Sequence, residues 1–326
     1  KGSALTLAAV LQGLARFRQP SQVAGVLLNG TTPAMAARLS QDIQRETGLP
    51  VLGCLPRLPE CSIPSRHLGL YTPGEIQDLG ERVEKLADAL GQYADVDGLL
   101  ELAQSAPPLE IPEEQEAPEV PAGILAVAWD EAFCFYYQEN LELLKHCGLA
   151  IVKFSPLSDK QLPEGTCGVY LGGGYPELYA QMLSENVSMR KALREAAEAD
   201  MPILAECGGF LYLQQTLEDS QGKAWPMAGI LDGAGYRTGR LQRFGYVTLH
   251  SLEDSAYLRS GEVVAAHEFH RWDCTQNGQA CLAQKPESEK HWNCMVCKGN
   301  LLAGFPHLYL PSCPQVARRV SDACRR

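Results

Sequence analysis

The sequence predicts an α/β protein of two domains, and three observations carry this prediction. Apolar runs of strand length alternate with stretches of helical periodicity in both halves of the chain. A segment with five prolines and five glutamates, residues 104–121, separates the two halves. The length of 326 residues is enough for two hydrophobic cores. We therefore expect one domain over residues 1–103, a solvated linker over 104–121 and a second domain over 122–326.

The first predicted domain alternates helices and strands with short connections, as a parallel sheet requires. Its expected elements are helices at 4–17 and 32–47, strands at 23–28 and 51–54, and a long helix from Thr72 to near residue 103. Thr32 and Pro33 form an N-cap and first-turn pair that opens the second helix. Asn29 follows the first strand, at the end of the sheet where ligands of open α/β folds bind.

The second predicted domain restarts the same alternation. Its expected elements are strands at 124–128, 150–154, 168–171 and 201–206, and helices at 135–146 and 186–199. After about residue 223 the helical periodicity fades. Short apolar runs there predict a β-rich closing section, with strands at 246–249, 263–265 and 301–303, before a last helix.

The composition argues against several classes of protein. The net charge of −11 disfavours nucleic acid or an anionic membrane as a partner. No apolar run approaches the ~18 residues that a membrane-spanning helix needs. Because no secretory signal is evident, the twelve cysteines predict free thiols of a cytoplasmic protein rather than a disulfide framework.

Cys207 is the strongest candidate for a reactive side chain. It follows the predicted strand 201–206 and precedes Gly208, Gly209 and a helical pattern. A nucleophile on a sharp turn from strand to helix is a recurrent way to expose a reactive atom. We also expect the helix N-terminus to lower the pKa of the thiol. The alternative is a buried core cysteine before a glycine turn.

Two further features complete a candidate thiol site. Gly172, Gly173 and Gly174 follow a strand one β-α unit earlier, so the backbone N–H groups of Gly173 and Gly208 are predicted to hold a developing oxyanion. The alternatives for the glycine run are a plain tight turn or, more weakly, a phosphate loop. His307, distant in sequence, is the best imidazole partner for the thiol, although a lone histidine among apolar residues is often structural.

Two other groups of residues suggest metal sites. His267 and His270 are spaced like a ligand pair on a helix, but their surroundings favour a strand, which would point them to opposite faces. Cys294 and Cys297 with His291, Cys274 and Cys281 form a candidate zinc knuckle, although a second Cys-x-x-Cys is absent.

The spaced motifs together resemble one family, the cobyrinic acid a,c-diamide synthases, which are glutamine amidotransferases of the cobalamin pathway. The resemblance covers most of the chain except the linker. The motifs are Leu171–Glu177, Ala205–Leu213, His267–His270 and Gly304–Tyr309 in the second half, and Leu55–Arg57 and Arg66–Leu70 in the first.

This resemblance implies a fold and a reaction. It implies the rear part of a P-loop-type synthetase domain followed by a class I glutamine amidotransferase domain. Cys207 would attack the side-chain amide of glutamine with His307 as its base, and ammonia would amidate a carboxylate of cobyrinate or a related tetrapyrrole, activated by ATP and Mg²⁺. Arg66 and His67 would bind the tetrapyrrole and Asn29 the nucleotide, and a homodimer is left open.

The chain also departs from the family pattern. Before residue 103 it has no glycine-rich loop followed by Lys-Ser/Thr, so Lys1 resembles a position inside the synthetase domain and we expect no tight ATP or Mg²⁺ binding by this chain alone. Tyr309 stands where many related enzymes place a glutamate, so the group that orients His307 is unassigned.

Several other functions stay open. Within the class, the nickel-sirohydrochlorin amidating enzyme is a close alternative, and cobyric acid synthase fits the histidine motif less well. Outside it, the alternatives are a stand-alone thiol hydrolase and a zinc-binding regulatory module. The Arg66–Leu70 segment argues against both of these, because neither function requires it.

Overall fold

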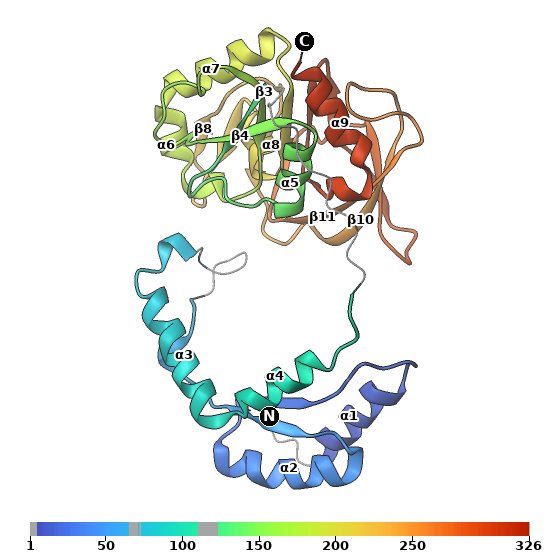
Figure 1. Ribbon diagram of the computed structural model, residues 1–326. Helices are drawn as coiled ribbons and strands as arrows, with labels where there is room; N and C mark the ends of the chain where they lie inside the picture. The colour runs from blue at the N-terminus through green and yellow to red at the C-terminus, as the bar shows by residue number, and fades with distance from the viewer. Residues whose placement is uncertain (1–4, 65–70, 72, 110–122, 326) are drawn as a thin grey trace. The chain divides into compact units, whose positions relative to one another are not determined.

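The computed structural model describes residues 5–64, 71, 73–109 and 123–325 (Figure 1). The chain divides into two compact units, Lys1–Glu113 and Glu114–Arg326. The division falls inside the predicted linker. Within the described residues, no helix has the length and apolar character that crossing a membrane requires.

The first unit has a small parallel sheet of two strands among its described residues, β1 (Val26–Asn29) and β2 (Val51–Leu55). Helices α1 (Leu5–Arg16) and α2 (Pro33–Thr47) pack with them around a small apolar core. The predicted start of α2 is confirmed, since the Thr32 hydroxyl accepts the Met35 N–H at 3.4 Å. Gly48 ends this helix with a φ of 73°.

The predicted long helix at the end of this unit is wrong in two respects, because it begins at Leu79 instead of Thr72 and it is two helices. They are α3 (Leu79–Tyr93) and α4 (Val96–Gln104). Ala94 pairs with Gly53 of β2, and the Asp95 N–H donates to the Leu52 carbonyl at 2.9 Å. These contacts with β2 interrupt the hydrogen-bond pattern of the helix. The Asp95 carboxylate then caps α4 by accepting the Gly98 N–H at 2.9 Å.

The second unit is built on a sheet of six strands among residues 123–325, in the order β15-β16-β6-β5-β3-β4. Five of them run parallel and β15 is antiparallel. Their bounds are β3 (Gly123–Ala128), β4 (Leu149–Phe154), β5 (Thr166–Leu171), β6 (Ile203–Glu206), β15 (Val296–Lys298) and β16 (Leu301–Gly304). The fold class predicted from the sequence is confirmed here.

Both faces of this sheet are covered, because alternate residues of each strand enter different apolar cores. One core contains Leu171 and Ala205, and the other contains Tyr170 and Leu204. Figure 1 shows α6 and α7 on one side of this unit and α9 on the other. The flanking helices are α5 (Gln138–His146), α6 (Ala180–Glu185), α7 (Val187–Glu198) and α9 (Pro314–Ala323).

Most of the predicted β-rich closing section forms two further sheets, but the strand predicted at 301–303 is β16 of the six-stranded sheet. The antiparallel one has the order β14-β13-β10-β11-β17, and the other has the order β12-β9-β7-β8. The bounds are β7 (Thr216–Glu218), β8 (Ala224–Pro226), β9 (Ala234–Arg237), β10 (Arg243–Ser251), β11 (Val263–His270), β12 (Trp272–Cys274), β13 (Cys281–Gln284), β14 (His291–Cys294) and β17 (His307–Leu308). This section matters for the site because it carries His307.

Candidate active site

Cys207 occupies the turn between β6 and the short helix α8 (Gly208–Tyr212). Its φ of 46° and ψ of −99° lie in a region that residues with a Cβ rarely adopt. The Cys207 N–H donates to the Gly304 carbonyl at 2.8 Å, which ties the turn to the neighbouring strand β16. Unusual dihedrals held by their surroundings are a common property of functional turns, and here they place the thiol at the carboxyl end of the sheet.

The glycines after Cys207 allow α8 to press against the turn that follows β5. A Cβ on Gly209 would lie 2.1 Å from the Leu171 carbonyl oxygen, and a Cβ on Gly208 would lie 3.0 Å from the Gly174 nitrogen. The Gly209 N–H also donates to the Gly172 carbonyl at 2.9 Å. The two glycine segments that the sequence singled out are therefore in direct contact.

His307 lies against the same glycine turn. A Cβ on Gly173 would be 2.2 Å from the His307 Cε1, so only glycine leaves room for the imidazole ring. His307 reaches this place because β16 lies beside β6, and the chain then turns into β17 next to β11. The turn 172–174 thus contacts both His307 and the first residues of α8, which directly follow Cys207.

The predicted role of the Gly173 N–H is not supported by the geometry. Gly173 and Phe135 form an antiparallel bridge, in which the Gly173 N–H donates to the Phe135 carbonyl at 3.2 Å. This bridge also explains why α5 begins at Gln138 instead of residue 135 as predicted. The Gly208 N–H remains directed at the Cys207 thiol, where it opposes the rise in the thiol pKa.

The protonation of the thiol differs from the prediction. Burial raises the pKa of Cys207, and the carboxylates of Glu177 and Glu268 add to this rise, so the effect of the helix N-terminus does not dominate. Burial lowers the pKa of His307 to about 4, with smaller contributions from His267 and His270. A neutral thiol and a neutral imidazole therefore coexist near neutral pH.

Glu206 is a residue whose importance the sequence analysis missed. Its side chain is buried between β5 and β17, with 1% of the residue exposed. One carboxylate oxygen accepts the Leu308 N–H at 3.0 Å, and the other accepts the Tyr170 hydroxyl at 2.9 Å. The second oxygen also lies 3.9 Å from the Nδ1 of His307. The available signal was a charged residue at the last position of an otherwise apolar strand.

His267 and His270 do not form a metal pair. Both lie on β11, where His270 is buried and His267 is half-buried on the opposite face. The Nε2 of His270 lies 3.2 Å from a Glu268 carboxylate oxygen, and its ring stacks on Phe305 at 3.9 Å between centroids. His270 thus packs beneath the site, within the core that contains Phe305.

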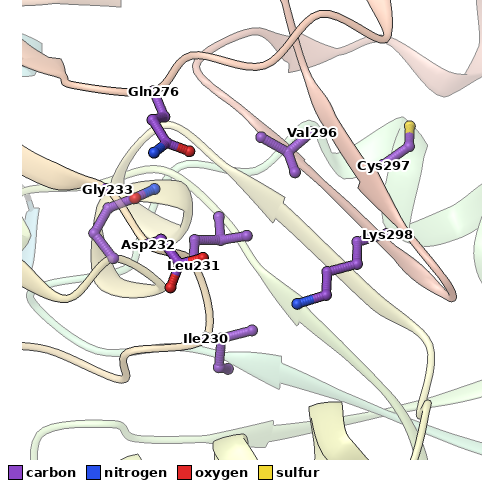
Figure 2. A pocket seen from close by; sticks show the side chains of 9 residues that line it. Ile230, Leu231, Asp232, Gly233, Gln276, Val296, Cys297 and Lys298 are labelled. Atoms are coloured by element: carbon purple, nitrogen blue, oxygen red, sulfur yellow. The ribbon is translucent and has the colours of Figure 1, made fainter.

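A pocket of ≈ 260 Å³ lies apart from these residues (Figure 2). Asp232, Gln276 and Lys298 contribute polar side chains to it, beside Ile230 and Val296. Lys298 pairs with Leu301, and Leu301 pairs with Ile203 at the amino end of β6. The pocket is therefore near the amino end of β6, whereas Cys207 follows its carboxyl end. None of the residues predicted to act in catalysis lines this pocket.

The sequence of the chain matches the model of the CobB/CobQ-like glutamine amidotransferase domain over residues 124–313. A cobyrinate a,c-diamide synthase of Caldanaerobacter subterraneus subsp. tengcongensis is 36% identical over 98% of this chain and 72% of its own length. The Salmonella typhimurium protein of the same name is 38% identical over 100% of this chain and 72% of its own length. The chain belongs to the cobyrinate a,c-diamide synthase family.

Similarity to solved structures is weaker. PurLQS from Thermotoga maritima has a TM-score of 0.42 and 16% identity, over 62% of this chain and 96% of that one. A glutamine amido transferase from Methylobacillus flagellatus has a TM-score of 0.35 and 13% identity, over 57% of this chain and 70% of that one.

The remaining predicted residues of this cobyrinate synthase family member are more scattered. Arg66 and His67 lie outside the described residues. Asn29 is exposed at the end of β1, and the adjacent Gly30 lies near Arg57, whose Nε is 3.7 Å from the position of a Gly30 Cβ. In the part of the chain that the structure describes, no three His, Cys, Asp or Glu side chains gather to hold a metal ion. Cys281 and Cys294 face each other across β13 and β14 as buried thiols.

Proposed function

We propose that this glutamine amidotransferase of the cobalamin pathway hydrolyses glutamine at Cys207. The ammonia released would amidate the a and c side-chain carboxylates of cobyrinate in an ATP-dependent reaction. The observation that carries the proposal is the contact of one glycine turn with both His307 and the turn that holds Cys207. The names of the relatives support cobyrinate over nickel-sirohydrochlorin as the acceptor.

The first step follows from the protonation of the pair. The Cys207 sulfur attacks the carbonyl carbon of the glutamine side-chain amide while its proton passes to the Nε2 of His307. A neutral imidazole can accept this proton, because burial keeps the pKa of His307 near 4 in the free protein. The thiol thus becomes nucleophilic only as it reacts, through general-base assistance.

The tetrahedral intermediate places negative charge on the former carbonyl oxygen. The Gly208 N–H, at the start of α8, is one donor for this oxygen. The Gly174 nitrogen lies 3.0 Å from the position of a Gly208 Cβ, as does the Pro176 Cδ. We therefore propose the Gly174 N–H as the second donor in place of Gly173. Both amides belong to backbone held by close glycine contacts, which keeps them oriented before the reaction.

Collapse of this intermediate breaks the carbon–nitrogen bond. His307 returns its proton to the leaving nitrogen, ammonia departs, and a γ-glutamyl thioester remains on Cys207. Water, deprotonated by His307, then attacks the thioester and releases glutamate with the free thiol. The buried surroundings of Cys207 limit the access of other water to the intermediate.

ATP and Mg²⁺ would activate the acceptor carboxylate as an acyl phosphate. Asn29, exposed at the carboxyl end of β1, fits a contact with adenine. The first unit does not fit the phosphates, since its sequence has no glycine-rich loop followed by Lys-Ser/Thr. Among the described residues, no acidic cluster fits Mg²⁺ either. We therefore expect no tight ATP binding by these 326 residues in calorimetry.

The proposal is tested by labelling with 6-diazo-5-oxo-L-norleucine, a glutamine analogue that alkylates amidotransferase nucleophiles. Cys207 should be modified before the other eleven cysteines, as read by peptide mass spectrometry. Cys207→Ser should abolish ammonia release from glutamine, and Cys281→Ser, a change at another buried thiol, should leave it intact. Glutamine hydrolysis that survives in Cys207→Ser would refute the proposal.

A further inference from the structure

Position 309, two residues after the histidine, cannot supply a carboxylate to His307. Tyr309 is exposed, and its ring packs edge-on against Tyr137 with 5.6 Å between centroids. Its N–H donates to the Ala265 carbonyl at 2.8 Å, which fixes the backbone along β11. The Nδ1 of His307 instead faces β6, and the carboxylate nearest to it there is that of Glu206.

We propose that Glu206 is the positioning residue for His307. Glu206 would thus act as the third member of a catalytic triad, although it lies on β6, the strand that leads to Cys207. This inference rests on the proposed function of Cys207 and His307. Glu206 precedes the nucleophile directly, and its carboxylate faces Nδ1, which leaves Nε2 as the nitrogen that accepts the thiol proton. Residues 206–207 thus contain both the proposed nucleophile and the carboxylate that faces the proposed base.

The hydrogen bonds of Glu206 support this role in two ways. The Leu308 N–H, which Glu206 accepts, belongs to the residue after the histidine, so this bond fixes the backbone that carries the imidazole. The Tyr170 hydroxyl fixes the other oxygen, the one that faces Nδ1. The separation of 3.9 Å exceeds a hydrogen bond in the free protein, and catalytic contacts of this kind commonly shorten when substrate binds.

The chemistry requires a negative charge at this place. When His307 takes the thiol proton it becomes an imidazolium in a buried site, where an uncompensated charge is strongly disfavoured. An ionised Glu206 compensates that charge and holds the remaining proton on Nδ1. Other titratable groups that face Glu206 cannot replace it, because they are neutral donors or the nucleophile itself: Tyr136, Tyr137, Tyr170 and Cys207.

The test measures glutamine hydrolysis by the full chain with Glu206→Gln, which keeps the size and an acceptor for the Leu308 N–H. We expect kcat/KM to fall about 100-fold or more with little change in KM, since the lost interaction is made in the transition state. Glu206→Asp should recover part of the rate. Tyr170→Phe, which leaves the carboxylate in place, should lose less than Glu206→Gln. Glu262→Gln, which breaks a structural ion pair with Arg319, is the matched control and should keep the wild-type rate.

A pH profile separates positioning from a purely structural role. Burial raises the pKa of Glu206 to about 8, so kcat/KM of the wild type should rise with pH up to about 8. This limb should vanish in Glu206→Gln and persist in Glu262→Gln. Above about pH 8, where Glu206 is ionised, imidazole ¹⁵N shifts should also show the Nδ1–H tautomer of His307 in the wild type and its loss in Glu206→Gln.

The failure of this inference can be distinguished from failure of the proposed function. If Cys207→Ser and His307→Ala abolish hydrolysis while Glu206→Gln keeps the wild-type kcat/KM, pH limb and tautomer, only the role of Glu206 is refuted. If Cys207→Ser retains hydrolysis, the proposed function falls first. Circular dichroism of each variant checks the fold, and Glu206→Asp tests the same role if Glu206→Gln does not fold.

Discussion

The two units of this chain use the same α/β principle but bury very different amounts of apolar surface. In the second unit, among residues 123–325, a six-stranded sheet is covered on both faces, and its cores include fully buried aromatic residues such as Tyr170 and Phe210. In the first, the described residues form a two-stranded sheet, and its core consists of small and aliphatic side chains. A sheet of two strands offers too little surface to cover its helices.

The apolar face of α1 shows the consequence. Val10, Leu14 and Phe17, on and just after this helix, are 56%, 62% and 83% exposed, and no described residue covers them. The comparison shows where this chain holds side chains in fixed positions. Cys207, Glu206 and His307 all lie in the unit whose sheet is covered on both faces.

Gly173→Ala should strongly reduce glutamine hydrolysis although position 173 carries no reacting group. The new methyl group would collide with the His307 ring, whose Cε1 lies 2.2 Å from the Cβ position. We expect glutamine hydrolysis to fall about 100-fold or more, because small displacements of catalytic groups are costly. Gly239→Ala is the matched control, since no atom lies within 4 Å of its Cβ position. Equal activity of the two variants would contradict the placement of His307.

The two units should unfold separately. Scanning calorimetry of the chain should show two transitions, with the first unit melting at the lower temperature because its core is smaller. Gly209→Ala should lower the free energy of unfolding of the second unit by about 1–3 kcal/mol, since its Cβ would overlap the Leu171 carbonyl. Only the temperature of the upper transition should therefore fall. A single transition that shifts as a whole in Gly209→Ala would show that the units are energetically coupled.

The stability of the second unit should carry a specific dependence on pH. Burial raises the pKa of Glu206 from its ordinary value to about 8, so the folded protein holds a proton that the unfolded chain has lost between about pH 4.5 and 8. The stabilising effect of this proton is complete below about pH 4.5 and decreases as the pH rises to 8. Glu206→Gln cannot titrate.

The free energy of unfolding of Glu206→Gln relative to the wild type should therefore increase from pH 5 to pH 8, as measured by denaturant titration. His307, whose pKa is lowered to about 4, adds the opposite slope between about pH 4 and 6.5. This contribution is common to both proteins and cancels to first order in their difference. A difference that stays constant across this range would contradict the burial of the Glu206 carboxyl.

The smallest expected effect on folding is at α1. Leu14→Gln with Phe17→Ser should change the free energy of unfolding by no more than about 0.5 kcal/mol, because both side chains are exposed. The same variant should reduce aggregation and the binding of an apolar dye, measured by light scattering and fluorescence. Glutamine hydrolysis should be unchanged. A large loss of stability would mean that this face packs against part of the protein.

The sequence was informative wherever the chemistry depends on local backbone. A short apolar strand followed by Cys207 and two glycines predicted a strand-to-helix turn at Cys207, and the structure shows this turn with a positive φ at the cysteine itself. The pairing of the turn 172–174 with residues 208–209 was also predictable, because loops at the carboxyl ends of neighbouring parallel strands meet.

The sequence was less informative wherever distant segments decide the outcome. The proposed role of Glu206 depends on the adjacency of β6 and β16, which brings His307 over the end of the strand that precedes Cys207. The raised pKa of Cys207 depends on burial, which outweighs the local effect of the helix. The break between α3 and α4 depends on bonds from Ala94 and Asp95 to β2, and no proline or glycine marks that position.

The protonated state of the buried Cys207 thiol bears on oxidation. Peroxide and disulfide reagents react with thiolates, so a thiol whose pKa is raised by burial resists conversion to sulfenic acid while no glutamine is bound. The chain carries twelve cysteines, and partly exposed ones such as Cys134 and Cys313 should react with oxidants before the buried Cys207. In the mechanism we propose, ionisation is deferred to the moment of attack, which would protect the Cys207 sulfur from oxidation before glutamine binds.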